Sequence, residues 1–246
     1  MNNPPWFEVW FDSEYYHLLY AHRDIQEAAD FIPRILNKIN LKKGSAILDL
    51  GCGKGRHALV MQECGYHVTG LDLSPNSISE AKKLSNHQEP EFYVHDMRMP
   101  FRTRYYDVVM NLFTSFGYFE TKNDELKTLH SMKLALKPGG IIVIDYLNAH
   151  KVQAGLPKSG EKNVQDIQFS WHTKEDADFV VKNILVNDRG RKSEFCERVR
   201  LIKPAEFNLL LEDAGLHIIH TFGNYKLDPF VAEHSDRFIL VAKAKA

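Results

Sequence analysis

The sequence predicts an α/β fold in which seven strands form a doubly wound, mostly parallel sheet, with an antiparallel β insertion after the fifth strand. Two observations support this prediction. Between residues 46 and 146, short apolar runs alternate with helical stretches, a rhythm typical of a parallel sheet. Between residues 164 and 202 the helical period disappears, and the pattern favours antiparallel strands.

The parallel part of the sheet is expected between residues 46 and 146. Strands are expected at 46–50, 67–71, 92–95, 106–112 and 141–146, and helices at 55–64, 74–85 and 124–136. Ser74 and Pro75 can begin the second helix, because serine is a favourable N-cap and proline suits the first turn. The segment 106–112 is nearly all apolar, which indicates a strand buried on both faces.

The N-terminal part of the chain is aromatic and helical in tendency. Seven aromatic residues lie close together, namely Trp6, Phe7, Trp10, Phe11, Tyr15, Tyr16 and Tyr20. An amphipathic helix is expected over 21–40, with Pro33 weakening or bending its middle. The aromatic cluster either packs on the main domain or covers a bound ligand, and both interpretations stay open.

The insertion is expected to contain three antiparallel strands, at 166–173, 179–187 and 192–202. Hairpin turns are expected at 174–176 and at 188–190, where Asp-Arg-Gly is a favourable turn sequence. A helix over 204–214 and strands at 217–222 and 237–244 then complete the α/β part.

Charge and composition exclude several classes of protein. With 31 Lys and Arg against 32 Asp and Glu, the net charge of -1 argues against nucleic-acid and membrane partners. Apolar runs are too short to cross a bilayer, and the N-terminus lacks the pattern of a secretory signal, so we expect a cytoplasmic protein. The three cysteines and twelve histidines show no metal-ligand spacing, so we expect no metal site.

The chain is organised around a glycine loop at residues 47–58. An apolar strand runs into an acid and then into glycines at alternate positions, followed by residues that can start a helix. The loop is close to the dinucleotide fingerprint G-x-G-x-x-G/A, with Arg56 at the last position. Asp72 ends the next strand and can accept hydrogen bonds from both hydroxyls of a ribose, as in binders of dinucleotides and of adenosine sulfonium compounds.

Five segments of the parallel part resemble the motifs of one family. Residues 49–53 read Asp-Leu-Gly-Cys-Gly, and segments 68–74, 95–97, 106–112 and 136–140 follow at that family's spacing. On these residues, the chain resembles the class I S-adenosylmethionine-dependent methyltransferase superfamily. The resemblance implies an enzyme with S-adenosylmethionine as cofactor and a Rossmann-like binding domain over 41–150 and 203–246.

The resemblance also implies a cofactor site at the carboxyl ends of the strands. Gly51, Gly53 and Gly55 are expected to let the backbone lie against the cofactor. Asp49 is expected to face its amino-acid end through the ammonium group or through water. Asp72 is expected to accept hydrogen bonds from the ribose diol, as an ionised carboxylate can accept two.

The other contacts implied by the resemblance involve the adenine and the ammonium group. Leu73 and Met97 are expected to sandwich the adenine. Asp96 is expected to accept a hydrogen bond from its amino group. Asn111, at the end of the fourth strand, is expected to offer its backbone carbonyl to the ammonium group.

Two segments outside these motifs are expected to close over the site. Residues 1–40 are interpreted as a lid segment, and the resemblance implies that Tyr20 and Arg23 close over the cofactor's carboxylate. These two residues lie about one turn apart and share a face if the segment is helical. The insertion, residues 151–202, is expected to cover the substrate, because similar enzymes place a lid there.

The loop at 112–119 indicates which class of methyl acceptor the chain uses. It lacks the acids of Mg²⁺-dependent O-methyltransferases, the prolines of amino-methylating DNA enzymes and the nucleophilic cysteine of cytosine C5 enzymes. It resembles the loop of small-molecule N-methyltransferases, and its aromatic residues either line a substrate site or pack in the core. Tyr118 and His150 are the first candidates to steer or deprotonate a nucleophile.

The sequence therefore favours in-line methyl transfer to a small-molecule acceptor, with an amine nitrogen preferred. A small-molecule O-methyltransferase and a non-catalytic S-adenosylmethionine-binding module remain alternatives. An NAD(P)-dependent oxidoreductase is a further alternative that the glycine loop alone permits. Monomer and homodimer are both left open.

Overall fold

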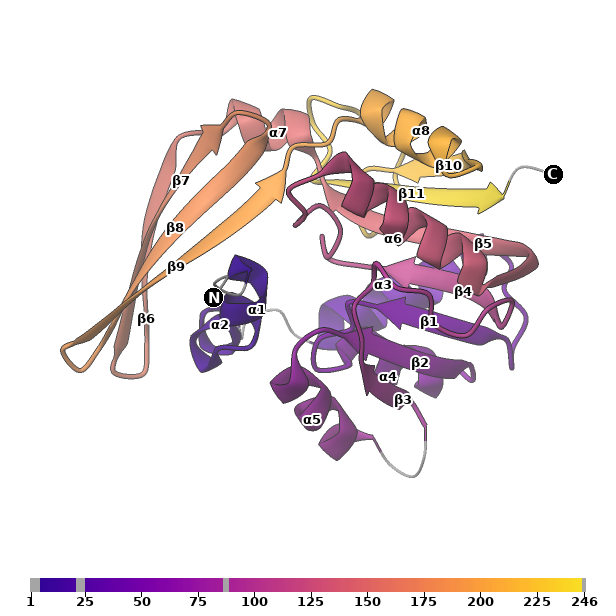
Figure 1. The fold of residues 1–246 in the computed structure, drawn as a ribbon, viewed down its shortest axis with the longest axis horizontal. Helices are drawn as coiled ribbons and strands as arrows, with labels where there is room; N and C mark the ends of the chain where they lie inside the picture. The colour runs from indigo at the N-terminus through magenta and orange to yellow at the C-terminus, as the bar shows by residue number, and fades with distance from the viewer. Residues whose placement is uncertain (1–4, 21–24, 86–88, 245–246) are drawn as a thin grey trace.

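The computed structural model describes residues 5–20, 25–85 and 89–244, and these residues form two β-sheets (Figure 1). The larger sheet has seven strands and the smaller has four, so the predicted α/β fold with an antiparallel insertion is confirmed. The strands of the larger sheet are β1 (Ala46–Leu50), β2 (His67–Asp72), β3 (Glu91–Val94), β4 (Tyr106–Asn111), β5 (Leu136–Leu147), β10 (Leu216–Phe222) and β11 (Arg237–Ala244).

The strand order of the larger sheet is β10-β11-β5-β4-β1-β2-β3. The first five strands along the chain pair in parallel, and β11 is antiparallel to both of its neighbours. From β1 the chain builds outward through β2 and β3, and then crosses to β4 on the other side. The carboxyl ends of β1 and β4 therefore lie at a topological switch point, where ligands bind in open α/β sheets.

Helices cover both faces of this sheet, because strand side chains alternate between the faces. Ile47 packs with α3 (Ile25–Lys38), α4 (Arg56–Glu63) and α5 (Pro75–Leu84). Leu48 and Leu50 point to the other face, where α6 (Lys122–Ala135) and α8 (Pro204–Asp213) pack. No described helix has the length and apolar character needed to span a bilayer.

Two local expectations in the parallel part can be compared with the structure. Ser74 caps α5 by accepting a hydrogen bond from the Ser77 N–H, as the sequence predicts. The sequence predicts the fifth strand over 141–146, but β5 already begins at Leu136. Leu136 pairs with Tyr106, and the register then shifts before Val108 pairs with Ile141, so the extra residues are absorbed as an irregularity of the sheet.

The insertion forms a four-stranded antiparallel sheet in the order β6-β7-β8-β9. Its strands are β6 (Lys158–Val164), β7 (Ile167–Asp176), β8 (Phe179–Asp188) and β9 (Arg191–Arg200). The expectation of three strands was wrong, because β6 is a polar edge strand without an apolar pattern. The first hairpin turn lies at 177–178 rather than at 174–176, whereas Arg189 and Gly190 form the second with positive φ angles.

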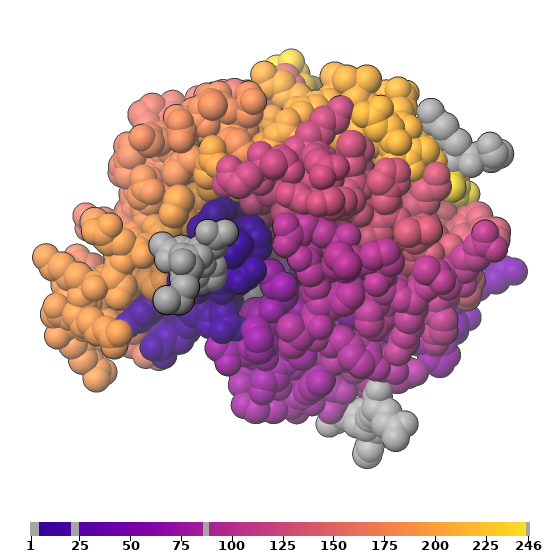
Figure 2. Space-filling view, viewed as in Figure 1, coloured from indigo at the N-terminus to yellow at the C-terminus, as the bar shows by residue number. Residues whose placement is uncertain are grey.

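The N-terminal segment packs against this insertion sheet. It contains α1 (Trp6–Phe11) and α2 (Glu14–Leu19), and Trp10 and Leu19 are buried with Phe169 of β7. Figure 2 shows the segment between the insertion sheet and the part of the chain that holds β1–β4. A short helix that the sequence did not reveal, α7 (Ala149–Ala154), connects β5 to β6.

Candidate active site

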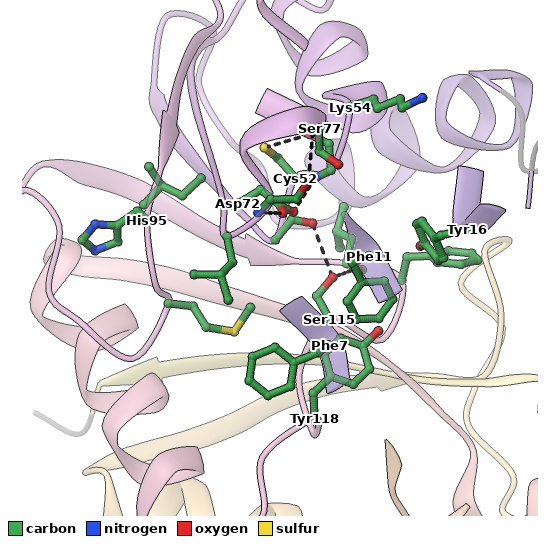
Figure 3. A pocket seen from close by; sticks show the side chains of 18 of the residues that line it. Phe7, Phe11, Tyr16, Cys52, Lys54, Asp72, Ser77, His95, Ser115 and Tyr118 are labelled. Atoms are coloured by element: carbon green, nitrogen blue, oxygen red, sulfur yellow. Dashed lines mark hydrogen bonds between the residues drawn. The ribbon is translucent and has the colours of Figure 1, made fainter. Parts of the chain in front are cut away.

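A cavity of about 420 Å³ opens at the switch point of the large sheet. The loops that follow β1, β2, β3 and β4 line one side, and residues of α1 and α2 with Tyr20 line the other. Figure 3 shows Asp72 on one side, Phe7, Phe11 and Tyr118 grouped on another, and Ser115 between them. The cavity therefore joins the glycine loop to the aromatic N-terminal segment.

The glycine loop uses its three glycines in different ways. Gly51 and Gly53 line the cavity with φ angles of 80° and 55°. A Cβ atom on Gly53 would meet no atom within 4 Å, so its neighbourhood leaves open space for a ligand. A Cβ on Gly55 would come within 2.6 Å of Phe92 Cζ, and Gly55 does not line the cavity. Gly55 thus allows α4 to pack closely on the sheet.

Asp72 joins the loops that follow β1 and β2. One of its carboxylate oxygens accepts the Gly53 N–H at 2.8 Å, and the other accepts the Ser74 N–H at 2.9 Å. Burial raises the pKa of Asp72, while these backbone hydrogen bonds act in the opposite direction. The backbone N–H of Leu73 also donates to this carboxylate, and Asp72 lines the cavity, where a carboxylate can accept further hydrogen bonds from hydroxyl donors.

Asp49 lies beneath the glycine loop and does not line the cavity. Its side chain is buried, and it accepts a hydrogen bond from the Ala58 N–H in the first turn of α4. Its Oδ2 atom has no hydrogen-bond partner among the described residues. Burial raises the pKa of Asp49 to about 7, and the charge of Asp72 adds to this effect. A cationic group above the loop would compensate for these two acids.

The raised pKa makes stability depend on pH. The folded protein binds the Asp49 proton more tightly than the unfolded chain, so the contribution of Asp49 to the free energy of unfolding falls as pH rises toward 7. We expect the wild type to lose stability relative to Asp49→Asn between about pH 4 and about pH 7. Urea unfolding at a series of pH values tests this, and parallel curves for the two proteins would contradict it.

The loop after β3 supplies Asp96 and Met97 to the cavity, and Leu73 joins them from the loop after β2. The Asp96 carboxylate accepts hydrogen bonds from the Arg98 side chain, from Nε to both oxygens at 3.0 Å and from Nη2 to Oδ2 at 2.6 Å. Burial works against ionisation, but Arg98 outweighs it and lowers the pKa of Asp96. Asp96 is therefore an ionised acceptor, and its assignment to an adenine amino group stays a prediction.

Asn111 connects the ends of β1 and β4 and does not line the cavity. Its side chain is buried and donates a 2.7 Å hydrogen bond to the Leu50 carbonyl. Its Oδ1 atom has no partner among the described residues. Leu112 and Phe113, which follow it, do line the cavity, so the predicted role of the Asn111 backbone carbonyl remains a prediction.

The loop after β4 is held in an unusual backbone conformation by residues that the sequence analysis missed. Phe113 and Thr114 both have a φ of 62°, which non-glycine residues rarely adopt. Asp145 of β5 accepts the Phe113 N–H through Oδ2 at 2.9 Å, and the Thr114 N–H donates to its backbone carbonyl. Arg237 of β11 donates to Asp145 Oδ1 at 2.8 Å and to Thr114 Oγ1 at 2.7 Å.

The sequence contains one signal for the hydrogen-bond network around Asp145. Asp145 is an acid inside the apolar run 141–147, and a buried acid is costly unless it is paired. Tyr225 donates a third side-chain hydrogen bond to Asp145 at 3.0 Å. Burial opposes the charge of Arg237, but Asp145 outweighs burial and raises the pKa of Arg237. The partners lie about eighty to ninety residues away, so the sequence alone does not identify them.

The N-terminal residues Tyr20 and His17 line the cavity. The Tyr20 hydroxyl donates to Glu197 at 2.7 Å and accepts from Lys182 at 2.7 Å, which ties it to the insertion sheet. Arg23, its predicted companion, lies outside the described residues. His17, which the sequence analysis missed, has a buried Nε2 without a partner among the described residues. Burial and the charge of Lys54 lower its pKa to about 4, so its ring is neutral at pH 7.

The two catalytic candidates lie in different places. Tyr118 lines the cavity, and its ring centroid is 4.9 Å from that of Phe11. His150 lies exposed on α7, where its backbone N–H donates to the capping residue Asn148, and it does not line the cavity. The structure thus brings Tyr118 to the cavity and leaves His150 outside it.

The fold and this site define an α/β protein with a cavity between a glycine loop and an aromatic segment at the switch point of the sheet. A family model described as a methyltransferase domain matches residues 20–221. The chain therefore belongs to this methyltransferase family. The family match supports the methyltransferase interpretation over the oxidoreductase alternative.

Individual relatives agree with this assignment. The putative methyltransferase YqeM of Bacillus subtilis is 34% identical over 54% of this chain, and the match spans 56% of that protein, about half of its length. The cypemycin N-terminal methyltransferase of a Streptomyces species is 24% identical over 81% of this chain and 84% of its own length.

Solved structures share the fold. A Clostridium acetobutylicum S-adenosylmethionine-dependent methyltransferase superposes with a TM-score of 0.80 at 20% identity, over 94% of this chain and 96% of the other. The sugar N-methyltransferase KedS8 of Streptoalloteichus superposes with a TM-score of 0.72 at 19% identity, over 94% and 93%.

Proposed function

We propose that this enzyme transfers a methyl group from S-adenosylmethionine to an amine nitrogen of a small molecule. One observation carries the proposal: the cavity combines a wall of glycine backbone and acids with a facing wall of aromatic rings. The first wall suits a nucleoside with a cationic tail, and the second suits an apolar or cationic acceptor. The printed names of two relatives, an N-terminal methyltransferase and a sugar N-methyltransferase, support nitrogen as the acceptor atom.

The chain's residues fit the cofactor on physical grounds. The open space at Gly53 admits a ligand against the backbone, and Asp72 presents acceptors toward the same space. The Oδ2 atom of Asp49, which has no partner within the described part of the chain, lies behind the loop, and together with Asp72 it makes this end of the cavity favourable for positive charge. Leu73 and Met97 offer apolar contact for an adenine ring. When bound, the cofactor supplies an electrophilic methyl group on a sulfonium.

Methyl transfer to an amine needs alignment and exclusion of water more than it needs a general base. Phe7, Phe11 and Tyr118 exclude water from one side of the cavity. We assign Tyr118 the role of orienting the nucleophile through its hydroxyl, because it is the catalytic candidate that reaches the cavity. We propose no role for His150, because its exposed position lies outside the lining.

Methylation of a panel of small amines and matched alcohols, scored by release of S-adenosylhomocysteine, tests the proposal. We expect release with amines and little with the alcohols. Release with alcohols alone would show an O-methyltransferase. Binding of S-adenosylmethionine without turnover of any acceptor would favour a non-catalytic binding module.

Asp72→Ala, measured in the same experiment, tests the placement of the cofactor. We expect its affinity for S-adenosylmethionine to fall by about tenfold to a hundredfold, because the ribose hydroxyls would lose their acceptor. Asp107→Ala is a matched control, since Asp107 also accepts a backbone N–H, that of Ala46, but does not line the cavity. Equal affinities in calorimetry for Asp72→Ala and the wild type would show that the ribose lies elsewhere.

A further inference from the structure

The aromatic wall of the cavity comes from two distant parts of the chain. Phe7 and Phe11 lie one helical turn apart on α1, and Tyr118 and Phe119 belong to the loop after β4. The ring centroids of Phe11 and Tyr118 are 4.9 Å apart, and those of Phe7 and Phe119 are 6.4 Å apart. The rings therefore form one continuous surface away from Asp72 (Figure 3).

Glu8 places a negative charge on this aromatic wall. It lies beside Phe7 on α1, is exposed and lines the cavity. Among the described residues, no side chain donates a hydrogen bond to its carboxylate. The nearby cation is Arg98, which is bonded to Asp96, stacks on Phe119 at 5.3 Å and does not line the cavity. Glu8 is thus available to a ligand.

Apart from histidines, the basic residues of the described cavity lining are Lys54 and Arg56. Lys54 and Arg56 belong to the glycine loop and the start of α4, on the cofactor side of the cavity. His17, on the N-terminal side, is neutral at pH 7 because burial and Lys54 lower its pKa. Ring faces and a carboxylate attract an organic cation, whereas they repel a phosphate.

We propose that the wall of Phe7, Glu8, Phe11 and Tyr118 recognises the acceptor as a small alkyl amine without a phosphate group, and that it stabilises the positive charge that forms on the nitrogen. This substrate class rests on the function proposed above. The cavity of about 420 Å³ must hold cofactor and acceptor together, and it lies near the lower end for small-molecule sites, so the acceptor is small.

The chemistry of the step agrees with such a wall. The lone pair of the neutral amine forms the new C–N bond with the methyl carbon, while the C–S bond breaks and its electrons stay on sulfur. Positive charge therefore moves from sulfur to nitrogen, and a primary or secondary amine then releases a proton to solvent. The aromatic faces and Glu8 stabilise this charge as it appears on the acceptor side.

Calorimetry in the presence of S-adenosylhomocysteine tests the proposal with three probes: choline, its neutral isostere 3,3-dimethyl-1-butanol, and phosphocholine. We expect choline to bind and the other two to bind at least about tenfold more weakly. Glu8→Gln and Phe11→Leu should each weaken choline binding by about fivefold. Glu14→Gln is the matched control, since Glu14 is an exposed acid on α2 that does not line the cavity.

The outcomes separate this inference from the proposed function. If S-adenosylhomocysteine binds but choline and its isostere bind equally, or neither binds, the cation-recognising wall is disproved while the cofactor site stands. Equal choline affinity in Glu8→Gln and the wild type also disproves the role of Glu8. If S-adenosylhomocysteine itself does not bind, the proposed function fails first.

Discussion

Replacing Asp145 with alanine is expected to lower the free energy of unfolding by about 3 kcal/mol, because the variant leaves the partly buried guanidinium of Arg237 without its partner. The Phe113 N–H would also lose its acceptor. We therefore expect the loop after β4 to leave its left-handed conformation, and methyl transfer to fall more than cofactor affinity does. Urea unfolding and S-adenosylhomocysteine release measure the two effects.

A double variant, Asp145→Asn with Arg237→Met, separates stability from positioning. It removes both buried charges, so much of the lost stability should return. Activity should stay low, because the double variant lacks the Arg237 hydrogen bond to Thr114. An unfolding free energy for Asp145→Ala within about 0.5 kcal/mol of the wild type would contradict the network's importance.

Replacing Glu125 with alanine is expected to have the second large effect, and to lower the free energy of unfolding by about 3 kcal/mol. Glu125 is fully buried on α6 and pairs with Arg200 at the end of β9. The backbone of Arg200 accepts the Tyr146 hydroxyl at 2.6 Å and donates to the Gly117 carbonyl at 2.9 Å. This pair thus holds the insertion sheet, β5 and the loop after β4 together.

A second ion pair of Arg200 sets the size of the loss expected for Glu125→Ala, and an exposed ion pair provides the control. Glu206 remains as a second partner of Arg200, which places the expected loss at the lower end for a broken buried pair. Glu120→Ala is the matched control, because Glu120 pairs with Arg198 from an exposed position and should cost less than about 1 kcal/mol. Equal losses in urea unfolding for the two variants would show that burial does not govern the effect.

Much of the cofactor side could be predicted because its signals are local. Glycines at alternate positions after an apolar strand, and an acid at the end of the next strand, specify a loop whose backbone is open to a ligand. The cavity contains Gly51, Gly53 and Asp72, as expected from these motifs. Gly55 differs, because its missing side chain makes room for Phe92 of β3, a neighbour that only the folded sheet reveals.

The acceptor side depends on contacts between distant segments. Tyr20 was assigned by resemblance to the cofactor's carboxylate, yet its hydroxyl is held by Glu197 and Lys182 of the insertion sheet. Trp10 donates to the same Glu197 at 2.7 Å. The aromatic segment therefore packs on the insertion sheet as well as lining the cavity, and its role as a cover over a bound ligand stays a prediction.

The sequence by itself determined the fold class and the glycine loop and strand-end acid that line the cavity, because strand rhythm, glycine spacing and strand-end acids act over a few residues, and the resemblance of its motifs indicated the methyltransferase family. Only the tertiary structure decided which aromatic residues line the cavity together and what holds the loop after β4. Phe11 meets Tyr118, and Asp145 meets Arg237, across about ninety to a hundred residues of chain. Such pairs are selected by packing and by the need to neutralise buried charge, and neither leaves a periodic mark in the sequence.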